Sequence, residues 1–365
     1  MNNVSPSAAD AGRLDPRKFE TTIDGKQTHL FTLTNKQGME VAVTNYGCAI
    51  VSILVPDRTG QRANVVLGHD SIEAVVNSPE PFLNTVIGRY ANRIARGRFT
   101  LYGEEHTLAV NNGPNHLHGG PTGFHARVWE AVQPDANTLE LTYTSADGEE
   151  GFPGELNVKL VYRLENEVNA LFMEYTATTT RPTVVNLTNH AFFNLHGVGC
   201  PTTGIEDHVV SIEADYFLPI DEVSIPTGEV LRVEGTPMDF RTPHSVGSRI
   251  GQSCEQLRHG SGYDHCYVLN KAEQGELSLA ATCTDPKSGR RLEVYTTEGG
   301  LQLYTGNWLN GFTGAGGTTF PARSALCFEA QCFPDTPNRP HFPTAVLQPG
   351  DEYQQVTVYK FSVAD

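Results

Sequence analysis

Apolar and polar residues alternate along much of this chain, and helical periodicity is scarce. The clearest case is residues 156–164, where every second residue is apolar and three of the four residues between them are polar. A period of two is typical of a strand that buries one face. The same alternation recurs at 139–143, 171–177, 292–294 and 356–358. The pattern predicts a fold of many antiparallel strands.

Turn signals separate the expected strands, and helices are few. Asp-Gly at 24–25 and Gln-Gly at 37–38 stand between β-branched runs, which is typical of hairpins. Only residues 71–76 and 253–258 favour helix, and both stretches are too short to be stable without packing. We therefore expect an all-β fold with few short helices, a large antiparallel β-sandwich whose sheets pack face to face.

The chain shows no linker or repeat that would divide it. Residues 1–16 are small and polar, so we expect them to be disordered, and we expect 17–365 to form a single domain. Long irregular segments at 78–98, 111–127 and 305–345 interrupt the strand pattern. Loops of that length in a compact domain are usually functional.

Composition narrows the classes of function. The 365 residues carry a formal net charge of −16 without any run of lysine or arginine, so we expect neither nucleic acid nor an anionic membrane as a partner. No apolar leader or membrane-length apolar run is present, which predicts a soluble, cytoplasmic protein. The seven cysteines are scattered without a CxxC pair, which favours reduced thiols over disulfides or zinc.

One apolar stretch, 183–197, carries a candidate catalytic histidine. His190 stands among valines, leucines and phenylalanines in TVVNLTNHAFFNLHG, so we expect it on or beside a buried strand. A histidine fixed in such a place suits proton donation. The pattern fits equally well a core histidine whose ring is hydrogen bonded by Asn186, Asn189 or Asn194. The segment alone leaves both interpretations open.

Two of the irregular segments carry possible ligand-binding groups. Arg93, next to Asn92, offers a fork of fixed donors that could hold a ligand oxygen or form a surface ion pair. His116 and His118 lie in NNGPNHLHGG, where an extended backbone would point both to the same face. They could ligate a metal, but their loop has no acidic residue or cysteine to complete a site. The loop fits two other interpretations better: one of the two histidines binds a hydroxylated ligand, or both are solvated loop residues.

Each of three polar residues in the C-terminal half has both a functional and a structural interpretation. Asp264, at the start of an apolar strand, could accept hydrogen bonds from adjacent sugar hydroxyls or cap a turn. Gln302 in LQLYTGNW could bind a ligand or simply face outward from a strand. Glu329, in the last irregular segment, has apolar neighbours that would raise its pKa towards the range in which it can act as a base. Alternatively, it could be a buried glutamate paired with an arginine.

Six motifs in order resemble those of the aldose 1-epimerase (galactose mutarotase) family, from about residue 20 to the end. They are GRYANRIARGRF, NHLHGG with GFHARVW, NLTNHAFFNL, YDHCYVL, LQLYTGNW and FEAQCFPDTPNRPHFP. The resemblance implies a large β-sandwich that interconverts the α and β anomers of free aldohexoses such as galactose and glucose. It implies His190 and Glu329 as catalytic acid and base, without metal or cofactor. Its implied sugar-binding residues are Asn92, Arg93, His118, Asp264 and Gln302.

The sequence also departs from the family, and other functions compete. Phe192 replaces a tyrosine that often follows the catalytic histidine, and Cys327 and Cys332 flank Glu329. These changes bear on sugar preference rather than on the type of reaction. A hexose-phosphate 1-epimerase would need a basic cluster, and a glycoside hydrolase would leave His190 without a task. A non-catalytic sugar-binding protein is the third alternative. We expect a monosaccharide as ligand and a monomer or weak dimer.

Overall fold

The computed structural model describes residues 14–199 and 204–364. Of the segment expected to be disordered, residues 1–13 lie outside this range. The first described element is a 3₁₀ helix, Pro16–Phe19, in which the Asp15 carboxylate accepts a hydrogen bond from the backbone of Arg17 at 3.1 Å. No helix within the described ranges is long and apolar enough to cross a membrane.

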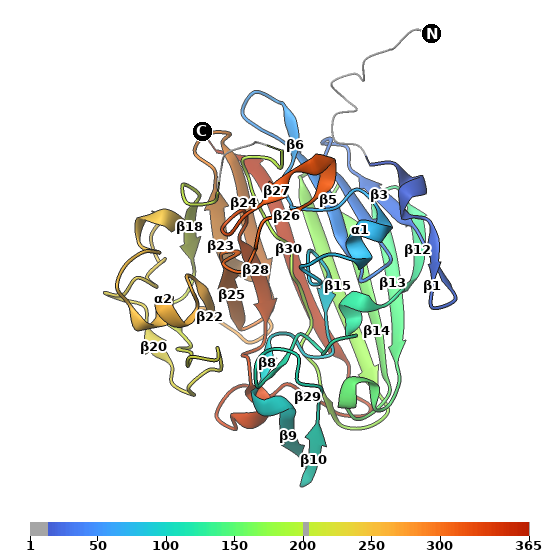
Figure 1. The fold of residues 1–365 in the computed structure, drawn as a ribbon, viewed down its shortest axis with the longest axis vertical. Helices are drawn as coiled ribbons and strands as arrows, with labels where there is room; N and C mark the ends of the chain where they lie inside the picture. Colours follow the sequence, from blue (N-terminus) through green and yellow to red (C-terminus); the bar gives the residue numbers. More distant parts are fainter. Residues whose placement is uncertain (1–13, 200–203, 365) are drawn as a thin grey trace.

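A nine-stranded antiparallel sheet forms the largest layer of the molecule. In Figure 1 it extends from β12 on the right to β18 on the left. Its strands, in spatial order, are β12 (Glu130–Asp135), β13 (Thr138–Ser145), β14 (Leu156–Leu164), β15 (Ala170–Thr179), β30 (Tyr353–Val363), β24 (Arg290–Thr296), β23 (Ser278–Thr284), β18 (Val209–Ile212) and β21 (His244–Ser245). The bounds of β14 coincide with the alternating segment 156–164.

Two smaller antiparallel sheets pack against the large one. The five-stranded sheet contains β20 (Leu231–Arg232), β19 (Tyr216–Phe217), β22 (Asp264–Val268), β25 (Gly300–Tyr304) and β28 (Cys327–Gln331). The four-stranded sheet contains β3 (Leu30–Thr34), β4 (Glu40–Thr44), β5 (Ile50–Pro56) and β6 (Arg62–Asn64). Side chains from all three sheets belong to one buried cluster, among them Val41, Leu160 and Phe328.

Short strand pairs connect and cover these layers. They are β1 (Thr21–Ile23) with β2 (Lys26–Thr28), β7 (Val86–Ile87) with β17 (Thr188–Asn189), β8 (Arg93–Ile94) with β11 (His116–Leu117), β9 (Arg98–Leu101) with β10 (Glu104–Thr107), β16 (Thr183–Val184) with β29 (Val346–Leu347), and β26 (Phe312–Thr313) with β27 (Thr319–Phe320). The expected hairpins are confirmed, because the turn at 24–25 joins β1 to β2 and the turn at 37–38 joins β3 to β4.

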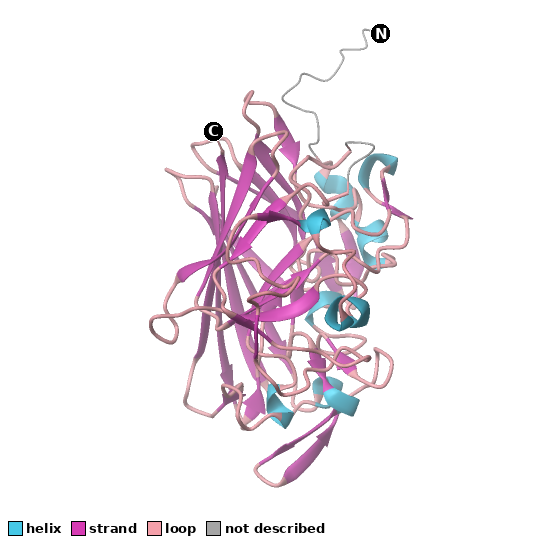
Figure 2. Ribbon diagram, turned by 90° about the vertical axis from the view of Figure 1, so that its left-hand side faces the viewer, coloured by secondary structure: helices cyan, strands magenta, loops and turns pink. Residues whose placement is uncertain are grey.

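Helices are few and short, as expected. The α-helices are α1 (Ile72–Val76) and α2 (Glu255–His259). Further 3₁₀ turns span Ala95–Gly97, Phe124–Ala126, Glu149–Gly151, Val246–Ser248, Ala315–Gly317 and Thr336–Asn338. Figure 2 shows the helices on one side of the strand layers. The prediction of an all-β fold with sheets packed around a common core is confirmed.

Strands β22, β25 and β28 have two different buried faces. Alternate residues, including Tyr267, Leu301 and Phe328, point into the core shared with the nine-stranded sheet. The residues between them form a row in which Gln302 pairs with both Cys266 and Glu329 across the strands. This second face lies under the irregular segments and is also buried. The sheet therefore supplies a fixed platform for polar groups.

Candidate active site

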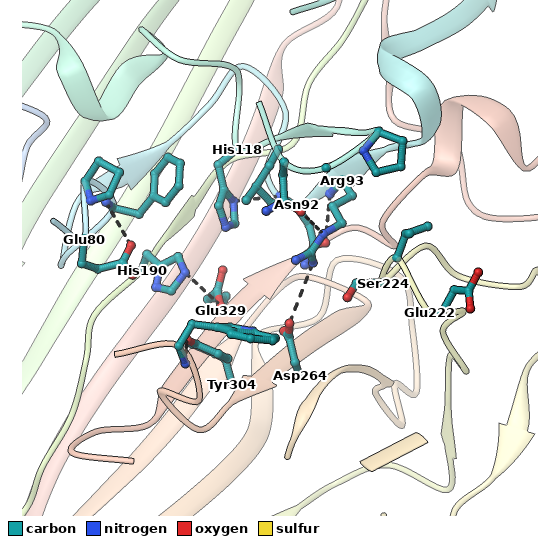
Figure 3. A pocket seen from close by; sticks show the side chains of 18 residues that line it. Glu80, Asn92, Arg93, His118, His190, Glu222, Ser224, Asp264, Tyr304 and Glu329 are labelled. Carbon is teal, nitrogen blue, oxygen red and sulfur yellow. Dashed lines mark hydrogen bonds and ion pairs between the residues drawn. The ribbon is translucent and has the colours of Figure 1, made fainter. Parts of the chain in front are cut away.

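A cavity of about 450 Å³ opens over the second face of the five-stranded sheet. All three irregular segments that we expected to be functional contribute to its wall, as does the segment around His190 (Figure 3). The lining residues that carry charged or hydrogen-bonding groups, or large rings, include Glu80, Phe82, Asn92, Arg93, Asn112, His118, His190, Glu222, Ser224, Asp264, Tyr304, Trp308 and Glu329. A volume of this size accommodates a small ligand.

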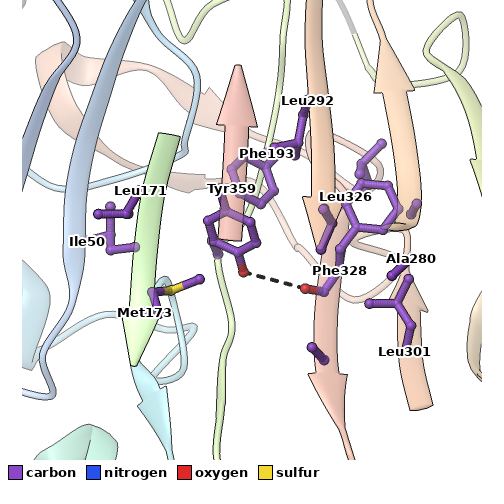
Figure 4. Close-up of a cluster of buried hydrophobic side chains, with 14 of the residues drawn as sticks. Ile50, Leu171, Met173, Phe193, Ala280, Leu292, Leu301, Leu326, Phe328 and Tyr359 are labelled. Carbon is purple, nitrogen blue, oxygen red and sulfur yellow. Dashed lines mark hydrogen bonds between the residues drawn. The ribbon is translucent and has the colours of Figure 1, made fainter. Parts of the chain in front are cut away.

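Glu329 projects from the middle of β28, and its side chain is 2% exposed. The expectation that it belongs to a long loop is wrong. The alternation of β28 escapes notice in the sequence because both of its faces are buried. On the opposite face Phe328 packs in the core, where its carbonyl accepts a hydrogen bond from the Tyr359 hydroxyl at 3.5 Å (Figure 4). The carboxyl therefore has a rigid support.

His190 directly follows β17, which confirms its placement beside a buried strand. Its backbone N–H donates to the Thr85 carbonyl at 3.0 Å, and its carbonyl accepts from the Asn84 N–H at 3.1 Å. The Phe192 ring stacks on the imidazole with centroids 4.8 Å apart and an angle of 11°. Backbone and ring are both fixed. Asn186 and Asn189, proposed as alternative partners of the ring, instead bond to other groups, including the Ala91 carbonyl and the Tyr162 hydroxyl.

The two candidate catalytic groups face each other across the cavity floor. His190 Nε2 lies 3.5 Å from Glu329 Oε1. The other polar atoms of the pair, His190 Nδ1 and Glu329 Oε2, have no hydrogen-bond partner among the described residues. Burial lowers the pKa of His190 to about 3. Burial also raises the pKa of Glu329 well above its ordinary value, with a further contribution from the charge of Asp264. Both shifts favour the neutral forms, a protonated Glu329 beside a neutral His190.

Asp264 and Arg93 form the opposite end of the cavity. Asp264 Oδ2 lies 3.9 Å from an Arg93 guanidinium nitrogen, and both side chains are nearly buried. Arg93 Nε donates to Asn112 Oδ1 at 3.0 Å, which fixes the plane of the guanidinium. Gln302 Nε2 donates to Asp264 Oδ1 at 2.7 Å. Gln302 is 3% exposed, so the alternative of an outward-facing strand residue is wrong.

Asn92 and His118 share a fixed contact beside this pair. The Asn92 backbone N–H donates to His118 Nδ1 at 3.1 Å, so neutral His118 carries its proton on Nε2. The expectation that His116 and His118 point to one face is wrong. His118 has a φ of 53°, so the backbone is not extended there, and His116 instead bonds to the Ala109 carbonyl at 2.7 Å. Only His118 of the two lines the cavity.

Ligand atoms of His118, His190 and Glu329 lie within 4.8 Å of one another, the spacing of a possible metal site. The hydrogen bond received by His118 Nδ1 leaves an N–H on Nε2, where a cation would need a lone pair. This donor suits a hydroxyl oxygen better than a metal ion. The arrangement favours proton transfer and hydrogen bonding.

The two cysteines near Glu329 lie away from the cavity wall. Cys327 packs with Phe192 and Tyr304 in a small apolar cluster, and burial raises the pKa of its thiol. Cys332 Sγ lies 3.7 Å from the Tyr90 hydroxyl, and its backbone N–H donates to Asn186 Oδ1. Both contribute to packing around the site.

Sequence analysis missed Glu80 and Phe82 as lining residues. Phe82 contacts the rings of His118 and His125 edge-on, each with centroids 4.7 Å apart. Neither residue belongs to a periodic pattern or a motif. The only signal was their position in the irregular segment 78–98. Trp308, 63% exposed, also lines the cavity.

The fold and the cavity define a class of protein: a β-sandwich with a cavity, lined by histidine, carboxyl and guanidinium groups, that suits a small hydroxylated molecule. A family model described as aldose 1-epimerase matches residues 29–360. The chain belongs to the aldose 1-epimerase family, and the family and the isomerase activity expected from the six motifs are confirmed.

Known relatives resemble the chain over nearly its whole length. A galactose mutarotase from Bos taurus is 46% identical over 335 residues, which cover 92% of this chain and 94% of the relative. An aldose 1-epimerase from Escherichia coli is 37% identical over 340 residues, covering 93% of this chain and 96% of that protein. The crystal structure of an aldose epimerase homologue from C. elegans superposes with a TM-score of 0.85 at 31% identity, covering 93% of this chain and 100% of that one.

Proposed function

We propose that His190 and Glu329 are the acid and base with which this enzyme interconverts the anomers of free aldohexoses, galactose and glucose in particular. The observation that carries the proposal is the 3.5 Å approach of His190 Nε2 to Glu329 Oε1 at the floor of the cavity. One proton shared by two fixed groups is what the opening of a hemiacetal requires, since one oxygen must lose a proton while the other gains one.

The reaction runs through the open-chain aldehyde. The Glu329 proton first moves to His190 Nε2 across their short separation. The resulting Glu329 carboxylate takes the proton of the C1 hydroxyl while the imidazolium donates its proton to the ring oxygen. The bond between C1 and the ring oxygen then breaks, and the C1 carbonyl forms. Rotation about the C1–C2 bond presents the other face of the aldehyde. Ring closure with the two roles reversed restores both groups, so the mechanism needs neither metal nor cofactor.

The other polar groups hold the sugar in place for this step. Arg93 and Asp264 offer donors and acceptors to adjacent hydroxyls, and His118 presents its Nε2–H to the cavity. Asn92 contributes its side chain to the wall. Gln302 acts through Asp264, because its amide holds the Asp264 carboxylate at 2.7 Å.

Polarimetry tests the proposal directly. Freshly dissolved α-D-galactose and α-D-glucose should reach their equilibrium rotation faster with the wild-type enzyme. Glu329→Gln and His190→Asn should each lower kcat by about a hundred- to ten-thousand-fold, because each removes one positioned proton-transfer group. Full activity in Glu329→Gln would overturn the assignment of the base. Sugar binding without acceleration by the wild type would instead support a non-catalytic sugar-binding protein.

A hexose-phosphate epimerase fits the cavity less well. Arg93 is the only lysine or arginine among the described lining residues, whereas Glu80, Glu222, Asp264 and Glu329 supply four carboxyl groups. A phosphate group would meet net repulsion there. Equal or faster turnover of galactose 6-phosphate relative to galactose would favour this second function.

We further propose a single catalytic domain from residue 17 to 365, acting as a monomer or weak dimer in the cytoplasm. The cysteines of the described ranges are free thiols, a state that a reducing compartment maintains. Sedimentation of the purified protein and fractionation of cells test these two points.

A further inference from the structure

Glu80 occupies a fixed position in the cavity wall between α1 and β7. Its backbone N–H donates to the Ser78 hydroxyl at 3.2 Å, and its carbonyl accepts from the Leu83 N–H at 3.2 Å. The side chain folds back so that Oε1 accepts from the Phe82 N–H at 3.4 Å. Two of these hydrogen bonds fix the backbone of Glu80, and the third holds its carboxyl group near the cavity.

The position of Glu80 relative to the catalytic pair is distinctive. Figure 3 shows Glu80 and Glu329 on opposite sides of His190, with Asp264 beyond Glu329. The Phe82 ring, next along the cavity wall, lies nearly parallel to the imidazole, at 14° with centroids 6.5 Å apart. The charge of Glu80 is close enough to contribute to the raised pKa of Glu329. It thus faces the same cavity from the far side of His190.

The chemistry of the sugar ring assigns a partner to this position. The ring oxygen is bonded to C1 on one side and to C5 on the other. When Glu329 contacts the C1 hydroxyl and His190 contacts the ring oxygen, the far side of His190 faces C5 and its hydroxymethyl group. We propose that Glu80 binds the C6 hydroxyl of an aldohexose and thereby favours hexoses over sugars without that hydroxyl. This inference rests on the proposed roles of His190 and Glu329.

The carboxyl group suits a hydroxyl partner. Burial raises the pKa of Glu80 to about 7, so near neutral pH it can accept a hydrogen bond or donate one, as a hydroxyl group can. A site built around such a bond discriminates against an analogue that lacks the hydroxyl, because its own polar group is then left without a partner.

The test compares sugars that differ only at C6. D-galactose, 6-deoxy-D-galactose and L-arabinose share the same ring hydroxyls, but the second lacks the C6 oxygen and the third lacks C6 altogether. The wild type should show a kcat/KM for galactose about 10- to 100-fold above that for 6-deoxygalactose. Glu80→Ala should abolish most of this preference, and Glu80→Gln, which retains hydrogen-bonding atoms, should keep part of it.

Glu222 provides the matched control, because its carboxyl also lines the cavity but lies on the side of Ser224 (Figure 3). Glu222→Ala should keep the wild-type preference for galactose. An unchanged preference in Glu80→Ala, with the wild type active, would overturn the inference and leave the proposed reaction intact. Calorimetric binding of the same sugars to Glu329→Gln gives a readout independent of turnover. Equal affinity for galactose and 6-deoxygalactose there would overturn the role of Glu80 on its own.

Discussion

Phe193 and Leu326 exchange two backbone hydrogen bonds, of 2.8 Å and 3.0 Å, three residues from His190 and three from Glu329. This bridge ties the segment after β17 to the segment before β28. His190 directly follows β17 and Glu329 lies within β28, so this contact joins the two segments that set the 3.5 Å separation of the proposed acid and base. Such a link keeps the acid and base in register through the reaction cycle.

Catalysis should be insensitive to pH around neutrality. A second proton enters the pair only in acid, since burial lowers the pKa of His190 to about 3. The last proton leaves only in alkali, because burial and then the charge of Asp264 raise the pKa of Glu329, with Arg93 opposing and Glu80 reinforcing the effect. We expect a broad plateau of kcat, measured by polarimetry after subtraction of the spontaneous rate. Glu80→Gln should shift the alkaline decline of kcat to lower pH, since it removes a negative charge that raises the pKa of Glu329. An alkaline decline unmoved by this change would contradict the assignment.

Gln302 should act on binding more than on turnover. Gln302→Ala removes the 2.7 Å hydrogen bond to the Asp264 carboxylate without deleting a group that lines the cavity. Loss of one charge-assisted bond of about 1.5 kcal/mol corresponds to roughly a tenfold increase in KM, with a smaller effect on kcat. Steady-state kinetics of the variant measure this split. A fall in kcat at constant KM would show instead that Gln302 acts in the chemical step.

Phe328 should be essential to stability rather than to chemistry. Its side chain is fully buried on the core side of β28. Phe328→Ala should lower the free energy of unfolding by about 3–5 kcal/mol through lost packing and a residual cavity. Val363→Ala, at a position 41% exposed near the end of β30, is the control and should change stability by less than about 0.5 kcal/mol. Urea unfolding distinguishes the two, and equal stabilities would contradict the burial argument.

A partly buried ion cluster outside the cavity should make stability depend on pH. His196 lies 3.0 Å from Asp285 and 2.8 Å from Asp207, and its side chain is 3% exposed. Burial alone would lower the pKa of His196, but the hydrogen bond and charge of Asp285, helped by Asp207, raise it. Burial alone would raise the pKa of Asp285, but hydrogen bonds, including the one from His196, lower it.

The raised histidine pKa stabilises the fold below the ordinary pKa of histidine, and this contribution is lost as pH rises through the folded value. The lowered aspartate pKa stabilises it above the ordinary pKa of aspartate, and is lost as pH falls. The cluster should therefore contribute most between these two ordinary values. Unfolding curves across pH should show a decline that begins above the ordinary pKa of histidine and that His196→Gln removes. Exposed His341→Gln should leave the decline unchanged, and a decline that persisted without His196 would assign it elsewhere.

Sequence patterns predicted the fold where only one face of a strand is buried. Residues 156–164 alternate because one side of β14 packs in the core and the other is more open. β28 lacks that contrast, since a second set of contacts covers its cavity face, so Glu329 looked like a loop residue. The prediction that His116 and His118 share a face was wrong for a local reason: the left-handed backbone at His118 turns the two side chains apart.

Candidate site residues were found largely through motifs, whose order indicated the family. Asn92, Arg93, His118, Asp264 and Glu329 come together around the cavity, a convergence that depends on sheet packing and that spacing alone could not show. Glu80 had neither motif nor periodicity. Its place follows only from the turn that carries it over the sheet.

The row formed by Gln302 and Glu329 on one face of β25 and β28, with Leu301 and Phe328 on the other, makes the site sensitive to strand registration. A slip of one residue between these strands during folding would exchange the faces, placing phenylalanine in the cavity and a carboxyl group in the core. A chain misaligned in this way could retain much of its β-structure and yet be inactive. Recovery of mutarotation after refolding therefore reports whether β28 has paired in its native register, which a measure of secondary structure alone would miss.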